Sequence, residues 1–139
     1  MSESKHREQR GQADVPKRAL STEEMAMYRA TAERQQAQEE KELVLRRERA
    51  WEMARQAATL LKQSFGAERV VVFGSLLRPH CFSRWSDVDI AAWGISLRDT
   101  FRAIGAVMDL GGDIEVNLVD INTCRETLRR TIEQEGQEI

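Results

Sequence analysis

The 139-residue chain has few of the features that place a protein in a membrane or an oxidising compartment. It contains two cysteines, Cys81 and Cys124, and no apolar run long enough to cross a bilayer. The first residues lack the apolar segment of a signal peptide. We therefore expect a cytoplasmic protein without membrane contact. Its two thiols should be free, because a reducing compartment disfavours a Cys81–Cys124 disulfide.

An excess of charge of one sign is also missing. The chain has 21 lysines and arginines against 23 aspartates and glutamates, which gives a net charge of −2. No overall positive field attracts nucleic acid, so general nucleic-acid binding is not expected. A chain of this length, with 41% hydrophobic residues, can form one domain of ordinary size and an extension.

Glycine and proline are rare in the first half of the chain. Residues 1–20 are polar and contain Gly11 and Pro16, which predicts a disordered tail. Residues 21–65 contain neither glycine nor proline and are rich in helix-forming residues, which predicts one long helix. Ser21 and Glu24 have the spacing of a capping box at its start.

The apolar pattern of this helix changes along its length. An apolar stripe between residues 44 and 65 predicts that the second half packs on the core. The stripe in the first half is thin, and two interpretations remain open. This part is either an exposed helix, with a break near residues 33–42, or an arm that docks a partner or a second copy.

Residues 66–139 are expected to form the core. The predicted order is a strand at 69–73, a strand at 87–93, a helix, a strand at 113–120 and a final helix from about 122 to 135. The first of these helices should begin after Ser96 and end at Gly111, with Leu97, Phe101, Ile104 and Met108 facing the sheet. This order predicts an α+β domain with a small mixed sheet covered by helices.

The candidate site residues lie where the first predicted strand ends and the second begins. Gly74-Ser75 follows the first strand, where backbone N–H groups and a hydroxyl could bind a phosphate. Asp87 and Asp89 lie one residue apart on the second strand and so project from one face. Two such carboxylates repel each other unless a cation lies between them, and oxygen ligands suit Mg²⁺. The alternative is a polar strand end, with Asp87 capping the loop.

At Gly74-Ser75, Arg78 and Asp87-Val88-Asp89, the chain resembles the minimal nucleotidyltransferases of the DNA polymerase β superfamily. The resemblance covers about residues 45–139, including the third strand and the last helix. It implies the polymerase β-type fold and transfer of AMP from ATP with Mg²⁺ as cofactor. It further implies that Asp87 and Asp89 are the metal ligands. The same resemblance implies that the nucleotide is bound by Gly74, Ser75, Arg78 and Ser86.

The third strand departs from the family pattern. The resemblance aligns the third acidic ligand of the family with Asn117, which can coordinate a metal but cannot act as a base. Glu115 lies on the same predicted face and could replace it. We therefore count Glu115 and Asn117 with Asp87 and Asp89 as the candidate catalytic residues.

Small nucleotidyltransferases of this kind often resemble the antitoxin of HEPN–MNT toxin–antitoxin pairs. The resemblance implies a protein adenylyltransferase that neutralises a HEPN ribonuclease partner, and the N-terminal helix could join two copies. Two alternatives remain: a pseudoenzyme that neutralises its partner by binding alone, and a nucleotidyltransferase for a small molecule or a tRNA end. We expect Trp85 and Trp93 to be packing residues, although Trp85 could stack a base, and His80-Cys81 to be a solvated loop pair.

Overall fold

The computed structural model describes residues 19–139, so most of the predicted tail lies outside the described residues. The chain divides into two compact units, residues 1–38 and 39–139. The helix α2 (Thr22–Ser64) is continuous, so the break expected near residues 33–42 is absent. The capping box is confirmed: the Glu24 backbone N–H donates to Ser21 Oγ (3.0 Å), and the Ser21 N–H donates to Glu24 Oε1 (3.3 Å).

The second unit contains a mixed four-stranded sheet, which confirms the α+β class. Its strands have the order β3-β2-β1-β4, with β2 parallel to β3 and the other pairs antiparallel. Along the chain, the elements after α2 are β1 (Arg69–Phe73), the 3₁₀ helix η1 (Gly74–Leu77), β2 (Val88–Trp93), α3 (Thr100–Leu110), β3 (Val116–Asp120), α4 (Glu126–Glu135) and β4 (Gln137–Glu138).

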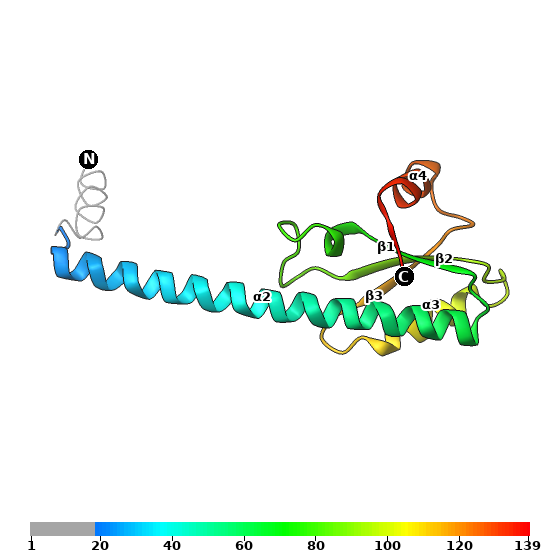
Figure 1. Cartoon of the computed structure of the whole chain (residues 1–139), viewed down its shortest axis with the longest axis horizontal. Helices are drawn as coiled ribbons and strands as arrows, with labels where there is room; N and C mark the ends of the chain where they lie inside the picture. The colour runs from blue at the N-terminus through cyan, green and yellow to red at the C-terminus, as the bar shows by residue number, and fades with distance from the viewer. Residues whose placement is uncertain (1–18) are drawn as a thin grey trace, which may run out of the picture. The chain divides into compact units, whose positions relative to one another are not determined.

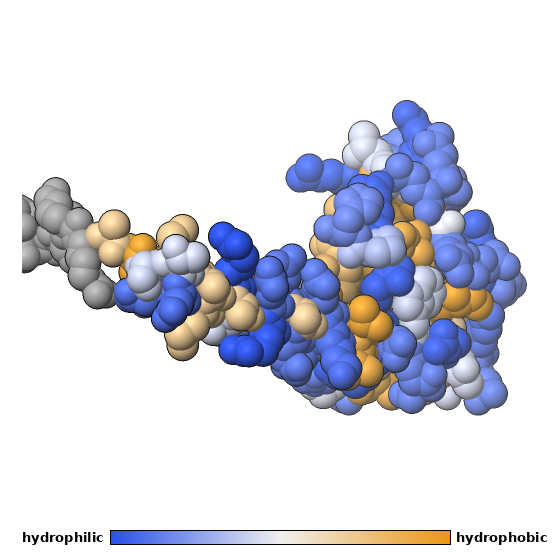
Figure 2. Space-filling view, turned by 60° about the vertical axis from the view of Figure 1, so that its left-hand side comes forward, coloured by the Kyte–Doolittle hydropathy of each residue, from blue (hydrophilic) through white to orange (hydrophobic). Residues whose placement is uncertain are grey.

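Helices cover both faces of this sheet, with α4 on the side opposite α3 and the C-terminal part of α2 (Figure 1). The sheet-facing side of α2 is rich in alanine, and Ala50, Ala54 and Ala57 are fully buried. Methyl side chains allow the helix backbone to approach the sheet closely. Ile132 of α4 packs in a second cluster on the opposite face. Figure 2 shows a mostly hydrophilic surface interrupted by small apolar patches.

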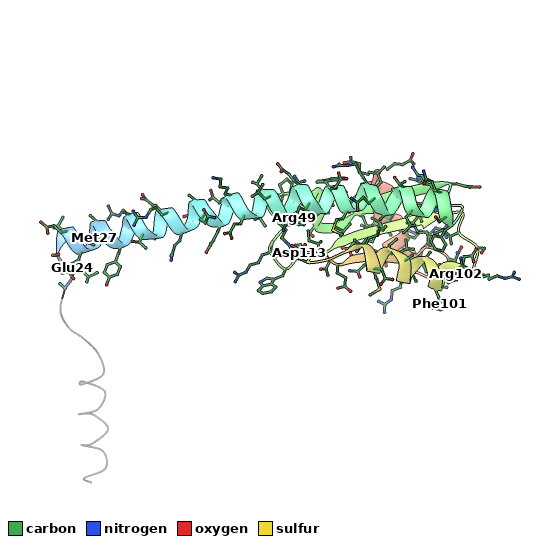
Figure 3. All side chains as sticks on the ribbon, turned by 90° about the horizontal axis from the view of Figure 1, so that it is seen from below. Glu24, Met27, Arg49, Phe101, Arg102 and Asp113 are labelled. Atoms are coloured by element: carbon green, nitrogen blue, oxygen red, sulfur yellow. The ribbon has the colours of Figure 1, made fainter. Side chains whose placement is uncertain are left out.

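The predicted start of α3 is wrong, and its predicted buried face is confirmed only at Ile104, which packs against the core, whereas Met108 is exposed. Ser96 forms a turn with Asp99, and the helix begins only at Thr100. Leu97 therefore precedes the helix and is 68% exposed, and Phe101 is 85% exposed. Phe101 and Arg102 project outward from α3 (Figure 3). The buried residues are smaller, namely Thr100, Ala103 and Val107.

Two further boundaries differ from the prediction. The strand β3 begins at Val116 rather than Asp113, although Ile114 is buried as expected. The helix α4 begins at Glu126, because Asp120 holds the preceding residues in a turn. The Asp120 carboxylate accepts hydrogen bonds from the Asn122 N–H (3.0 Å) and the Thr123 hydroxyl (2.9 Å).

The strand β4 was not predicted, and it depends on a glycine. Gly136 connects α4 to β4, which pairs with Val71 and Val72 of β1. A Cβ atom on Gly136 would collide with Val71 Cγ1 and would lie 2.5 Å from the Ile132 carbonyl oxygen. Only glycine allows the chain to turn this close to the sheet.

We predict that Gly136→Ala lowers the free energy of unfolding by about 1–3 kcal/mol, as for other overpacked sites. Chemical denaturation followed by circular dichroism measures this change. Gly105→Ala is the matched control, because a Cβ at this helical position meets no atom within 4 Å. The control should be neutral or stabilising, since alanine favours a helix over glycine. An equal loss in both variants would contradict the packing argument.

Candidate functional site

The predicted site residues meet where β1 ends and β2 and β3 begin. Phe73, the last residue of β1, pairs with Asp89 of β2, and Asp89 pairs with Asn117 of β3. Gly74 follows Phe73, so its backbone lies beside the Asp89 side chain. The strand pairing therefore brings together residues that are far apart in the sequence.

One residue pair extends this group. The N–H of Val88, the first residue of β2, donates to the carbonyl of Glu115 (2.9 Å), so the parallel pairing extends to the residue before β3. Asp87 and Glu115 are therefore neighbours on the same face as Asp89 and Asn117, because side chains alternate along a strand. Glu115 is exposed, whereas the other three are partly buried.

Gly74 approaches the Asp89 carboxylate closely. Its φ of +81° lies in the left-handed region, which favours glycine. A Cβ atom at this position would lie 2.8 Å from Asp89 Oδ2. Both the backbone conformation and the close approach therefore require glycine, and they leave the space around the carboxylate free of side-chain atoms from the turn.

The surroundings of the Asp89 carboxyl disfavour its charged form. Burial raises its pKa, and the negative charge of Asp87 raises it further. A hydrogen bond from the Asn117 side chain acts in the opposite direction and lowers the pKa. The amide of Asn117 thus partly stabilises the charge of Asp89, as a cation in this position would.

The donor set suits a small divalent cation. Asp87 and Asp89 supply two carboxylates on one face, and Asn117 can add an amide oxygen. Hard oxygen ligands of this kind are preferred by Mg²⁺. In the described part of the chain, no group of three or more histidine, cysteine, aspartate or glutamate side chains is arranged to hold a metal. A cation here would therefore depend on the aspartate pair and on an amide or water.

The remaining predicted residues divide into two groups. Ser75 follows Gly74 in η1, directly after the end of β1. Arg78 does not point to them, because its guanidinium pairs with Glu135 of α4 (3.4 Å). The Ser86 hydroxyl accepts a hydrogen bond from the Ser83 N–H (2.9 Å) and so holds the loop before Asp87. Arg78 and Ser86 are thus engaged in contacts that shape the fold.

Sequence reasoning missed two arginines of α2 that hold the loops of the site. Arg46 donates to the Ser86 carbonyl (3.0 Å) and the Asp113 carbonyl (3.4 Å), and Arg47 donates to the Leu76 carbonyl (2.8 Å). These three carbonyls lie next to, or two residues from, Asp87, Glu115 and Ser75, as the sequence shows.

The environment of Arg46 is unusual for a charged side chain. Only 14% of it is exposed, and the buried Nε atoms of Arg46 and Arg47 have no hydrogen-bond partner. Arg49 lies next to them and pairs with the Asp113 carboxylate at 2.8 Å (Figure 3). No pattern in the sequence distinguishes these arginines from the solvated charges around them.

Trp85 contradicts its predicted packing role. Its side chain is 78% exposed and lies under the guanidinium of Arg84, 5.0 Å from the ring centroid. Trp93 does pack, against the second core cluster. His80 and Cys81 are exposed in the loop, and both Cys81 and Cys124 are free thiols.

No protein-family model, curated protein or solved structure matches this chain. Among residues 19–139, no helix combines the length and apolar character required to span a membrane.

We predict that Asp89→Asn raises the melting temperature at pH 7. The pKa of Asp89 in the folded protein lies above its ordinary value of 3.8, so the protonated form is favoured by folding. The resulting stabilisation is complete below pH 3.8 and is lost as the pH rises through the raised pKa. At pH 7 the charged carboxylate is destabilising, and asparagine removes that charge.

Differential scanning calorimetry between pH 3 and pH 8 measures this effect. The advantage of Asp89→Asn should shrink toward the acidic end, where the wild-type carboxyl is protonated. Asp109→Asn is the control, because Asp109 is an exposed residue of α3. A melting temperature of Asp89→Asn below that of the wild type at pH 7 would contradict the argument.

We further predict that Arg46→Met lowers the free energy of unfolding by about 1–3 kcal/mol, since it leaves the Ser86 and Asp113 carbonyls without their donor. Urea denaturation measures the loss. Arg55→Met is the matched control on the same helix, where an exposed pair with Glu52 contributes little. Similar losses in both variants would exclude a special role for Arg46.

Proposed function

We propose that this protein is a Mg²⁺-dependent nucleotidyltransferase that transfers AMP from ATP to a protein acceptor. The observation that carries the proposal is the approach of the Gly74 backbone to Asp89, whose carboxyl is close enough to Asp87 to be affected by its charge. Ser75 follows Gly74 in the same turn. A glycine turn next to two carboxylates offers room for a phosphate and ligands for its cation. The resemblance of this spacing to the minimal nucleotidyltransferases supports the same reaction.

Each residue has a definable task in this reaction. The acceptor oxygen attacks the α-phosphorus, the bond to pyrophosphate breaks, and the acceptor proton leaves. A bound Mg²⁺ would neutralise the charge that builds on the phosphoryl oxygens. Asp87 and Asp89 would hold that ion, while Gly74 and Ser75 orient the phosphates through backbone and hydroxyl donors.

The acceptor proton needs a base, and Glu115 is the best candidate. It is the exposed carboxylate next to Asp87, so an acceptor arriving from solvent can reach it. Asn117 cannot accept this proton as a carboxylate would, and it orients Asp89 instead. We therefore propose a site in which Glu115 takes the role of the missing third acid.

The proposed acceptor is a HEPN-type ribonuclease toxin, so the protein would act as a cytoplasmic antitoxin. This assignment rests on the resemblance to HEPN–MNT pairs, which is a weaker argument than the site geometry. The first unit offers a docking surface, because Met25, Met27 and Tyr28 are exposed. The same surface could join two copies of the chain.

A second candidate function is neutralisation of the partner by binding alone. The hydrogen bond from Asn117 to Asp89 favours it, because this amide partly replaces a cation. A site stabilised in this way could keep its shape without metal and without turnover.

Label transfer from α-³²P-ATP tests the proposal. Purified protein, Mg²⁺ and a candidate HEPN partner should yield labelled partner, and Asp87→Asn should reduce the rate by about 100-fold or more. Asp109→Asn should behave as wild type, because its carboxylate lies on the exposed side of α3.

Two results separate the two functions. If the wild type transfers no label while Asp87→Asn still neutralises the partner, the protein acts by binding alone. If Asn117→Asp increases transfer, the third carboxylate limits the reaction, and the site is a functional but weakened transferase.

A further inference from the structure

The exposed indole of Trp85 lies two residues before Asp87. Tryptophan has a large apolar surface, and leaving 78% of it in water is unfavourable unless a ligand or partner covers it. Arg84 lies against the ring, 5.0 Å from its centroid, and this cation–π pair restrains the indole. The ring is thus presented at the surface beside the carboxylates.

A cavity of about 620 Å³ adjoins this tryptophan. Its lining residues come from α2, the loop before β2, the end of α3 and the connection from α3 to β3, and they include Arg46, Arg84, Trp85, Asp87, Asp113 and Glu115. The volume falls in the range of small-molecule sites, which is roughly 300–1,000 Å³. Asp87 and Glu115 belong to both the cavity and the proposed transferase site.

The charges of the lining indicate which part of a ligand fits. The guanidinium groups of Arg46 and Arg84 are outweighed by the carboxylates of Asp87, Asp113 and Glu115. Arg46 is also engaged with the Ser86 and Asp113 carbonyls. This lining does not favour a further phosphate, but it suits a neutral, planar and polar group.

The order of the strands gives the direction of the ligand. Gly74 and Ser75 follow β1, Asp87 precedes β2, and Glu115 precedes β3, in the spatial order β1, β2, β3. The cavity therefore lies on the β3 side of Asp87, away from the phosphate turn. A nucleotide with its terminal phosphates at Gly74-Ser75 and its α-phosphate at Asp87 has its nucleoside end within reach of the cavity.

We propose that Trp85 is the stacking platform for the base of the nucleotide and that this cavity holds the nucleoside. The inference rests on the proposed function, because it requires the triphosphate to lie at Gly74-Ser75 and Asp87. Stacking on an aromatic ring is available to every base, so Trp85 contributes affinity, and selection among bases depends on the polar lining.

Isothermal titration calorimetry with two probes in Mg²⁺ tests this assignment. Mg²⁺–ATP has a base, and Mg²⁺–tripolyphosphate has only the phosphates. Trp85→Ala should weaken ATP binding roughly 5- to 100-fold, as for other base–aromatic stacks. Its affinity for tripolyphosphate should be unchanged. Trp85→Phe should retain most of the ATP affinity, because phenylalanine also offers a ring face.

Phe101→Ala is the matched control, since Phe101 is an aromatic residue that is even more exposed, at 85%, and does not line the cavity. It should bind both probes as the wild type does. A second readout is the part of the tryptophan fluorescence that is lost in Trp85→Phe, which ATP should quench and tripolyphosphate should not, since Trp51 and Trp93 also emit.

The outcomes separate the two levels of the proposal. If the wild type binds neither probe, the proposed function and the base platform both fail. If ATP and tripolyphosphate bind but Trp85→Ala changes neither affinity, only the platform fails. Equal weakening of both probes would make Trp85 a structural residue and overturn the platform. If Trp85→Ala leaves the ATP affinity unchanged but slows label transfer, the cavity binds the acceptor, and the base platform is overturned as well.

Discussion

Two partly buried arginines join the segments that carry the candidate site. Arg46 and Arg47 project from one turn of α2 and donate to carbonyls in two connections. Leu76 and Ser86 lie in the connection from β1 to β2, and Asp113 lies in the connection from α3 to β3. Each of these connections leads into a strand that carries a site residue. A guanidinium group can hold several carbonyls at once because its donors lie in a fixed plane, whereas lysine offers a single point charge. The helix thus contacts both the connection that contains the Gly74 turn and the connection that leads into β3.

The second constraint is the repulsion between neighbouring carboxylates. Asp89 is partly buried next to Asp87, and its pKa is raised as a result. The protein relieves this cost with the Asn117 amide and keeps the space open with Gly74. Such a local loss of stability is common at functional sites, where groups are held ready for a ligand.

Local signals in the sequence predicted much of the fold. Three local signals determine structure through near neighbours, and each was found as expected. They are the capping of α2 by Ser21 and Glu24, the absence of glycine through Ser64 and the apolar run of β1. The face of α3 was predicted only in part because two apolar stripes compete, and close packing selects the one with the smaller residues. The strand β4 has only two residues and no strand pattern, since it exists through its pairing with β1. Likewise, Arg46 and Arg47 find their partners 29 to 67 positions away, which no local pattern can reveal.

The register of the sheet also has a kinetic consequence. The strand pairs that build the site join residues closer in sequence than the β1–β4 pair does. Phe73 pairs with Asp89 and Val88 with Val116, whereas β4 brings Glu138 to Val71 across most of the unit. Closing the β1–β4 loop costs about 0.8 kcal/mol more than closing the β2–β3 loop, if the entropy grows with the logarithm of loop length. Contacts of lower sequence separation form earlier, so β1, β2 and β3 can associate before β4 docks. Transient release of β4 would then expose one edge of the sheet while the carboxylates and the glycine turn stay assembled.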